Sequence, residues 1–157
     1  MTDPASPVWS RVAGPFRRAE ASARVGSGDA VWERASRGLL RWQVKTASGF
    51  AVDSPGPVSA GERLQVTARV LGVRVVEPVE VVAVVQTHDR VGFAYRTLPG
   101  HPVDGEEAFI LHRTGDDVWL TVRSLTRAAA QQPWRALYPL LRVAQLVARR
   151  RYLRALR

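Results

Sequence analysis

The sequence predicts an α+β domain in which a curved antiparallel sheet wraps around a long C-terminal helix, with a further helix near the N-terminus. Three observations favour this class: helical spacing of apolar residues over 30–44, at least five strand-like runs over 63–126, and helical spacing again from residue 133. Strands joined by such short turns pair antiparallel. A curved sheet has a concave face to cover, and a long helix lying across it would do so.

Length and composition are those of an ordinary globular domain, with 157 residues, 46% hydrophobic and 24% charged. The absence of cysteine excludes disulfides, thiolate metal sites and cysteine nucleophiles. We see no membrane-spanning apolar run and no secretory signal, and we therefore expect a cytoplasmic location. We divide the chain into an irregular lead-in over residues 1–24 and a single domain over residues 25–157.

The formal net charge of +9 lies in the last quarter of the chain. Residues 118–157 contain nine arginines and no acid, whereas residues 1–117 contain 14 basic and 14 acidic residues. Lys45 is the one lysine among 23 basic residues, which fits a nucleotide-composition bias as well as a need for the planar guanidinium. The basic excess is thus a feature of the C-terminal helix.

The first helix is predicted over residues 30–44. Asp29 precedes it, and its carboxylate can accept backbone N–H groups of the first turn. Gly49 follows as a terminator. Apolar residues recur at three- and four-residue spacing: Trp32, Ala35, Leu39 and Trp42.

The central part of the sequence is typical of strands. Residues 63–70 alternate polar and apolar side chains, and residues 73–86 form a valine-rich run in which Pro78 indicates a bulge or an edge position. A hairpin tip is predicted at residues 88–90. Further strands are predicted over residues 91–98, 106–113 and 118–126.

The last helix is predicted from about Pro133 to the end of the chain, with Pro139 marking a kink or the true start. One face is predicted to be apolar and the opposite face basic. The apolar residues are Leu137, Leu140, Leu141, Ala144, Val147, Ala148 and Tyr152. The basic residues are Arg135, Arg142, Arg149, Arg150, Arg154 and Arg157.

Four segments resemble the family named domain of unknown function 1990 (DUF1990, UPF0548). They are VGSGDAVWERASRGLLRW (25–42), GFAYRTLPGHPVDGEEAF (92–109), VWLTVRSLTRAA (118–129) and RRRYLRAL (149–156). Arg96 and Ala128 depart from the family pattern, which leads us to expect a glycine and a proline there. The family is similar to START-like, helix-grip proteins. The resemblance implies a helix-grip fold over most of the chain and a cavity for a hydrophobic or amphipathic small molecule or lipid.

Strand parity predicts a polar cluster at one end of this cavity. Tyr95 and Thr97 share a strand face with Phe93, and Glu107 shares one with Phe109. If the aromatic side chains point to the concave side, these polar ones do too, and the intervening loop brings His101 over the same end. The residues predicted to orient a ligand are Tyr95, Thr97, His101 and Glu107. Those predicted to line the cavity are Phe93, Tyr95, Phe109, Trp42, Val118, Leu120 and Val122.

Three interpretations of the polar cluster stay open. A few convergent polar groups in an apolar pocket are typical of a ligand site. Alternatively, Tyr95 and Thr97 satisfy backbone groups of the turn, while Glu107 holds the loop closed. In the third interpretation, Glu107 and His101 act as catalytic acid and base. We expect a binding protein rather than an enzyme, with no cofactor and no metal, because the three histidines lack metal-ligand spacing.

The basic helix offers an alternative function. Arg142, Arg149, Arg150 and Arg154 would suit the phosphates of a nucleic acid or the surface of an anionic membrane. A solvated face whose charges suit the C-terminus of the helix is the simpler interpretation. The alternative to ligand binding is therefore an interaction protein that uses this helix.

Overall fold

The computed structural model describes residues 1–10, 14–54, 56–70 and 72–157. Its helices are α1 (Asp29–Leu39), α2 (Gln43–Thr46) and α3 (Trp134–Tyr152). Its strands are β1 (Arg17–Ser27), β2 (Ala51–Val52), β3 (Arg63–Val70), β4 (Val73–Gln86), β5 (Arg90–Thr97), β6 (Val103–Thr114) and β7 (Asp117–Ala128). Within the described residues these strands form one sheet in the order β1-β7-β6-β5-β4-β3-β2, with every neighbouring pair antiparallel.

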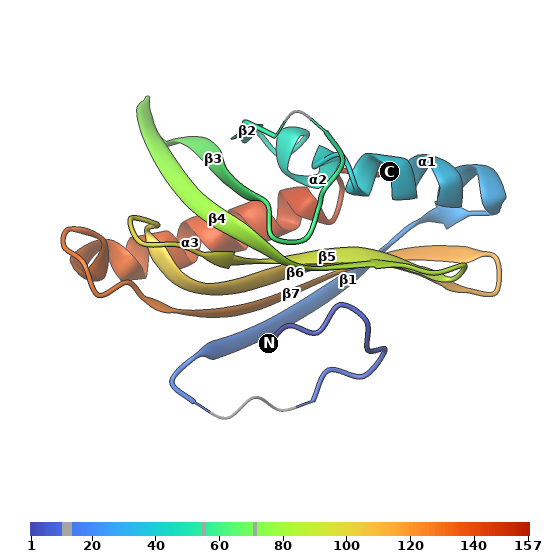
Figure 1. Ribbon diagram of the computed structural model, residues 1–157, viewed down its shortest axis with the longest axis horizontal. Coiled ribbons are helices and arrows are strands. Elements are labelled where there is room, and N and C mark those ends of the chain that lie inside the picture. The colour runs from blue at the N-terminus through green and yellow to red at the C-terminus, as the bar shows by residue number, and fades with distance from the viewer. Residues whose placement is uncertain (11–13, 55, 71) are drawn as a thin grey trace.

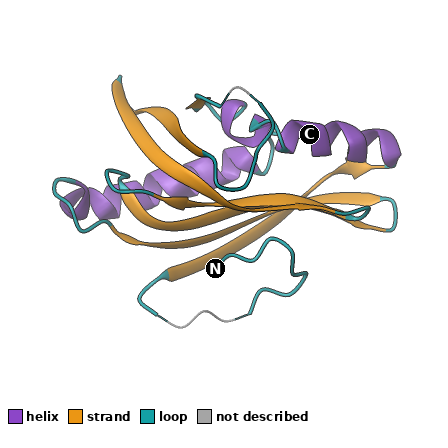
Figure 2. Cartoon of the chain, in the orientation of Figure 1, coloured by secondary structure: helices purple, strands orange, loops and turns teal. Residues whose placement is uncertain are grey.

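The sheet is curved, and the three helices lie on its concave side (Figure 1). β3 and β4 bend away from the plane of β5, β6 and β7 toward the helices, and the N-terminal segment lies beneath the opposite face. Figure 2 shows α3 as the long helix that runs beside this curved sheet. The predicted α+β architecture, with a sheet wrapped around the C-terminal helix, is confirmed.

The strands from β3 to β7 lie where the sequence predicts them, and of the two interpretations of Pro78, a bulge or an edge position, the bulge is wrong. The register shift in β4 falls between Val81 and Ala83, rather than at Pro78. Pro78 lies just beyond Val79–Thr97, the last pair that β4 makes with β5. The carbonyl oxygen of Pro78 accepts the backbone N–H of Leu98 at 2.9 Å, and its missing N–H is tolerated because the paired part of β5 has ended there.

The first helix is interrupted, which corrects the prediction of one helix over residues 30–44. α1 ends at Leu39, Trp42 has a left-handed φ of 61°, and α2 starts at Gln43. This conformation costs a bulky residue roughly 1 kcal/mol or more. Burial of the indole offsets the cost, since its ring packs against Phe93 with centroids 4.7 Å apart. The resulting turn directs Lys45 into the interior.

Two further predictions near the N-terminus are wrong. Residues 17–24, predicted to be irregular, belong to the edge strand β1, where Ala21 pairs with Val122 of β7. Gly28, not Asp29, is the N-cap of α1, and the Asp29 carboxylate instead accepts a 2.6 Å hydrogen bond from Arg113. Residues 11–13 of the predicted lead-in lie outside the described part of the chain.

The start of the chain is fastened to the convex face of the sheet by a buried arginine. Arg123 of β7 donates Nη1 to the carbonyl oxygens of Asp3 at 2.7 Å and Ser6 at 3.0 Å, and Nε to Glu20 at 2.9 Å. Arg90 donates to the Ser6 carbonyl as well, at 2.8 Å. These bonds satisfy both the guanidinium and the backbone of a segment that lacks regular structure.

The core lies between the concave face and the helices. Phe93 pairs with Phe109 across β5 and β6, and Phe109 pairs with Val122 across β6 and β7. All three side chains are fully buried on the same face, as strand parity predicts. The face shared by the aromatic residues is therefore the concave one.

The faces of α3 differ from the prediction. Tyr152 is buried against the core, but Leu137, Leu140 and Val147, which were predicted to share one apolar face with it, are exposed. Arg149, predicted to lie on the outer basic face, is half-buried. Within the described residues no helix combines the length and the apolar character that a membrane span requires.

Candidate functional site

A pocket of about 410 Å³ lies between the concave face of the sheet and α3. Its apolar lining includes Phe50, Ala68 and Val75 on the sheet side and Ala144 and Ala148 on α3. Its polar lining includes Lys45, Glu77, Tyr95, Thr97, His101 and Glu107. Strand alternation points Tyr95, Thr97 and Glu107 to the concave face, and the loop between β5 and β6 carries His101 to the same place.

The structure brings together the predicted polar residues but not the predicted apolar ones. Tyr95, Thr97, His101 and Glu107 all line the pocket. The residues predicted to line it from the apolar side are instead packed solidly against one another in the core. Strand alternation shows which face of the sheet a residue occupies. It does not show whether that residue is packed by its neighbours or borders an open pocket. The residues corrected in this way are Phe93, Phe109, Trp42, Val118, Leu120 and Val122.

Lys45 and Glu107 form the centre of a buried polar network. Lys45 Nζ lies 3.0 Å from Glu107 Oε2 and donates a 2.8 Å hydrogen bond to the hydroxyl of Tyr152. The Tyr95 hydroxyl donates to the same carboxylate oxygen of Glu107. Burial opposes the charged form of Lys45, but Glu107 and the two tyrosines outweigh it and hold the pKa of Lys45 well above its ordinary value. Lys45 is therefore an ammonium and not a nucleophilic amine.

Aromatic rings surround the Lys45 ammonium. Its Nζ lies 4.9 Å from the ring centroid of Phe50, 5.0 Å from Tyr95, 5.5 Å from Phe109 and 4.7 Å from Tyr152. A compact ammonium on an unbranched stem suits such a cage, whereas a guanidinium is broader and planar. The sequence held a signal for this residue, because a chain that uses arginine almost throughout keeps a single lysine here.

Glu77 of β4 is a second carboxylate at the pocket, and the sequence analysis missed it. Its side chain is 19% exposed, toward the pocket, and accepts no hydrogen bond from any residue that the structure describes. Burial raises the pKa of Glu77 to about 7, with the Lys45 charge opposing and the Glu107 charge reinforcing the rise. Its signal was weak, because a glutamate in a long valine-rich strand also suits a solvated face.

His101 is held as a neutral hydrogen-bond donor. Its Nδ1 accepts the backbone N–H of Val103 at 3.0 Å, so the hydrogen of the neutral ring is assigned to Nε2. Burial, and then the Lys45 charge, lower the pKa of His101 to about 3. Nε2 lies 3.9 Å from Glu77 Oε2, which is too far for a direct hydrogen bond. The two groups therefore face the pocket as a separated donor and acceptor.

Thr97 serves the loop between β5 and β6. Its hydroxyl oxygen accepts the backbone N–H of Gly105 at 2.9 Å. Gly105 has a φ of 159°, and a Cβ there would lie 1.9 Å from the carbonyl oxygen of Leu125. β6 and β7 thus approach so closely that only glycine fits, and this close approach fixes the loop that carries His101.

The geometry does not support Glu107 and His101 as a catalytic pair. Glu107 is engaged by Lys45 and Tyr95, and the ring nitrogen of His101 that lacks a hydrogen is occupied by the Val103 N–H. No group of three or more His, Asp or Glu side chains within the described residues is arranged to hold a metal ion. His88 lies at an exposed hairpin tip, and His112 lies on the strand face opposite Glu107.

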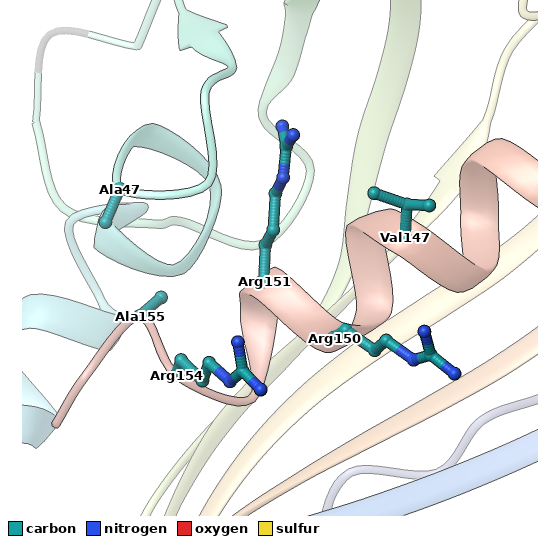
Figure 3. A pocket seen from close by; sticks show the side chains of 6 residues that line it. All are labelled: Ala47, Val147, Arg150, Arg151, Arg154 and Ala155. Carbon is teal, nitrogen blue, oxygen red and sulfur yellow. The ribbon is translucent and has the colours of Figure 1, made fainter.

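Two arginines of α3 stand at the rim of the pocket. Arg149 donates Nη2 to the Ser124 hydroxyl at 2.9 Å, and its buried Nε has no hydrogen-bond partner among the described residues. Arg151 lines this pocket and also a neighbouring hollow of about 400 Å³. Arg150 and Arg154 line only that hollow (Figure 3).

Comparison with known sequences gives one family. The family model described as "Domain of unknown function (DUF1990)" matches residues 7–155. A UPF0548 protein of Deinococcus radiodurans is 35% identical over 168 residues, which cover 98% of this chain and 80% of that protein. A UPF0548 protein of Arabidopsis thaliana is 28% identical over 112 residues, which cover 67% of this chain and 55% of that protein.

Comparison with solved structures gives the fold. A hypothetical protein from Helicobacter pylori has a TM-score of 0.63 at 12% identity, over 97% of each chain. Major latex-like protein 151 of Panax ginseng has a TM-score of 0.52 at 16% identity, over 88% of this chain and 99% of that chain. Norcoclaurine synthase of Thalictrum flavum, solved in complex with dopamine and hydroxybenzaldehyde, has a TM-score of 0.51 at 14% identity, over 92% of this chain and 95% of that chain. At these identities the likeness shows the fold alone, and this is the predicted helix-grip fold.

Proposed function

The chain belongs to the family described as domain of unknown function (DUF1990), and we propose that it binds a small amphipathic molecule in the pocket between its sheet and α3. One observation carries the proposal: a void of about 410 Å³ opens onto Glu77, whose carboxyl group accepts no hydrogen bond from any described residue. A few polar groups that face an otherwise apolar pocket are typical of a ligand site. A ligand with a polar end would supply the partner that the protein chain does not.

The size and lining of the pocket suit such a ligand. Pockets for small molecules span roughly 300–1,000 Å³ and combine an apolar wall with a few polar groups that fix orientation. The apolar part of the ligand would lie against Phe50, Ala144 and Ala148. Burial of each methylene against this wall contributes about 0.8 kcal/mol.

Glu77 and His101 define what the polar end must offer. Glu77 presents a carboxyl group, and His101 presents the N–H of Nε2 at 3.9 Å from it. A hydroxyl group placed between them would donate to Glu77 and accept from His101. Lys45 and Glu107 satisfy each other and would form the floor of the pocket rather than bind the ligand directly.

The comparisons support a ligand-binding role in a limited way. One fold neighbour, norcoclaurine synthase, holds dopamine and hydroxybenzaldehyde, so the fold is able to enclose small molecules. The chemistry of the ligand of this chain is argued only from its own pocket.

An acid–base function is the second candidate, and the pKa of about 7 at Glu77 is the observation that favours it. A carboxyl group that titrates near neutral pH in a pocket is suited to take up or release a proton. This moves the predicted catalytic role from Glu107 and His101 to Glu77. Chemical change of a bound molecule that Glu77→Gln stops would support this candidate, and release of the molecule unchanged would reject it.

Fluorescence titration with anilinonaphthalene sulfonate, an amphipathic probe, tests the binding proposal. We expect one probe to bind per chain and Ala148→Phe, which fills the pocket from α3, to weaken binding at least tenfold. Ala136→Phe places the same ring on the same helix at an exposed position that does not line the pocket, and it should leave binding unchanged. Equal binding by wild type and Ala148→Phe would reject the pocket as the site.

A further inference from the structure

The outer face of α3 exposes large apolar side chains in a row. Leu140 is 63% exposed, Val143 57% and Leu146 52%, and Leu137 and Val147 are exposed as well. Leu140, Val143 and Leu146 are three residues apart and lie within about 120° around the helix axis, and these three form the apolar row. Leu137 lies on the other side of the helix, and Val147 also lines the pocket. Single exposed apolar residues are common on soluble proteins, but a contiguous patch marks an interaction surface.

Exposed arginines flank the apolar row. Arg142, Arg150 and Arg154 are exposed, and residues 118–157 contain no acid that could neutralise them. Figure 3 shows Arg150 and Arg154 extending from the same side of the helix, beside the hollow of about 400 Å³ that they line with Val147. The face therefore combines apolar side chains with positive charge along α3 and just beyond its C-terminal end.

We propose that the outer face of α3 docks on an anionic lipid bilayer. An interfacial amphipathic helix places its apolar side chains among the acyl chains while flanking arginines meet the lipid phosphates. A helix of 19 residues is about 28 Å long, which lets the apolar row and Arg150 contact the surface together. Arg142 lies within the row and Arg154 just beyond the C-terminal end of α3, so positive charge is available along the second half of the helix.

A nucleic acid and a second copy of this chain fit this face less well than a bilayer does. A nucleic acid would pair with the arginines but would leave Leu140, Val143 and Leu146 against a polar backbone. A second copy packed through the same face would bring two arginine-bearing surfaces together, and residues 118–157 contain no acid to place between them. An anionic bilayer satisfies both the apolar and the basic side chains.

The opposite side of the same helix lines the pocket. Ala144, Ala148 and Arg151 contribute to the pocket, whereas Leu140, Val143 and Leu146 do not. A docked α3 would hold the rim of the pocket beside the membrane. The docking itself does not depend on whether the pocket binds a ligand, so the two proposals fail separately.

Vesicle flotation with the full chain tests the proposal. Wild type should float with vesicles of equal parts phosphatidylglycerol and phosphatidylcholine and should not float with phosphatidylcholine alone. The variant Leu140→Gln/Val143→Gln/Leu146→Gln should lose at least tenfold in partitioning, because the inserted apolar surface is gone. Val73→Gln, at the β3–β4 hairpin, is a matched control whose valine is also 63% exposed, and it should float like wild type.

A charge variant separates a lipid surface from other partners. Arg150→Gln/Arg154→Gln should weaken flotation on the order of tenfold, whereas Arg37→Gln/Arg41→Gln on and just after α1 should not. Wild type that does not float, or an apolar variant that floats as well as wild type, would overturn the proposal. So would a dimer in light scattering that the apolar variant disperses, or binding to duplex DNA that only the arginine variant weakens.

Discussion

Lys45 Nζ lies 3.0 Å from Glu107 Oε2, although 62 positions separate the two residues in the chain. The 2.8 Å hydrogen bond from Lys45 to Tyr152 extends the link to α3. One ammonium therefore connects α2, β6 and α3 beneath the pocket. Because Lys45 is only 2% exposed, the pair is part of the folded core rather than a surface ion pair.

Removal of the lysine should destabilise the protein. Lys45→Met leaves the Glu107 carboxylate without its cation in a mostly buried place, and we expect the free energy of unfolding to fall by about 3 kcal/mol. Urea unfolding measures the change. The double variant Lys45→Met/Glu107→Leu removes both charges and should recover most of the loss. A single variant as stable as wild type would mean that the pair contributes nothing.

Glu77 should make stability fall as the pH rises. Its pKa is raised from 4.5 to about 7 in the folded chain, so the folded state holds a proton that the unfolded state has already lost across that window. The stabilising effect of the protonated Glu77 is fully present below pH 4.5. It is lost as the pH rises through about 7, and the free energy of unfolding falls by about 3 kcal/mol.

Glu77→Gln isolates this contribution. The stability of the variant relative to wild type should rise between about pH 5 and about pH 8, as measured by urea unfolding. Glu33→Gln, at an exposed glutamate of α1, is the control for replacing a carboxyl group by an amide. A pH-independent difference for Glu77→Gln would show that the carboxyl group titrates normally.

His101 should make stability fall as the pH falls, which is opposite to the effect of Glu77. Its pKa is lowered from 6.5 to about 3, so the unfolded chain binds a proton that the folded chain cannot bind between these values. The stabilising effect of the neutral ring is fully present above pH 6.5 and is lost as the pH falls toward about 3, by about 5 kcal/mol in total. His101→Gln should therefore gain on wild type as the pH falls. Wild type itself should change little where the two windows overlap, since the effects of Glu77 and His101 oppose each other.

Gly105 should tolerate no side chain. Gly105→Ala places a Cβ against the Leu125 carbonyl oxygen at 1.9 Å, and the strands must separate to admit it. We expect a loss of roughly 2 kcal/mol or more in thermal unfolding. Gly56→Ala, where a Cβ meets no atom of the described residues within 4 Å, should be nearly neutral. Equal stability of the two variants would refute the close approach of β6 and β7.

The sheet was predictable because its hairpins alternate apolar and polar residues between clear turns. β1 was missed because the inward positions of its alternation are Ala19, Ala21 and Ala23, which have little strand preference and little apolar surface. The break after α1 was missed because the spacing of Leu39 and Trp42 is helical, and only tertiary packing holds Trp42 in a left-handed conformation.

The sequence predicted the polar residues of the site that lie on β5, β6 and the loop between them, but not those on other elements. Parity places Tyr95 and Glu107 on one face, and the structure pairs them directly across β5 and β6. Parity gives no information on partners from other elements, so Lys45 and Glu77 could not be joined to them from the sequence. The depth of the core was equally hidden, which is why Phe109 was expected at the pocket wall and is found packed beneath it.

Native mass spectrometry of the protein purified from its own organism tests ligand binding most directly. We predict that wild type carries one small molecule per chain, that extraction recovers it, and that Glu77→Gln carries less of it. Ala148→Phe, which fills the pocket, should carry none, whereas Ala136→Phe should carry as much as wild type. Wild type at the mass of the bare chain, or the same bound molecule on Ala148→Phe, would contradict the proposal.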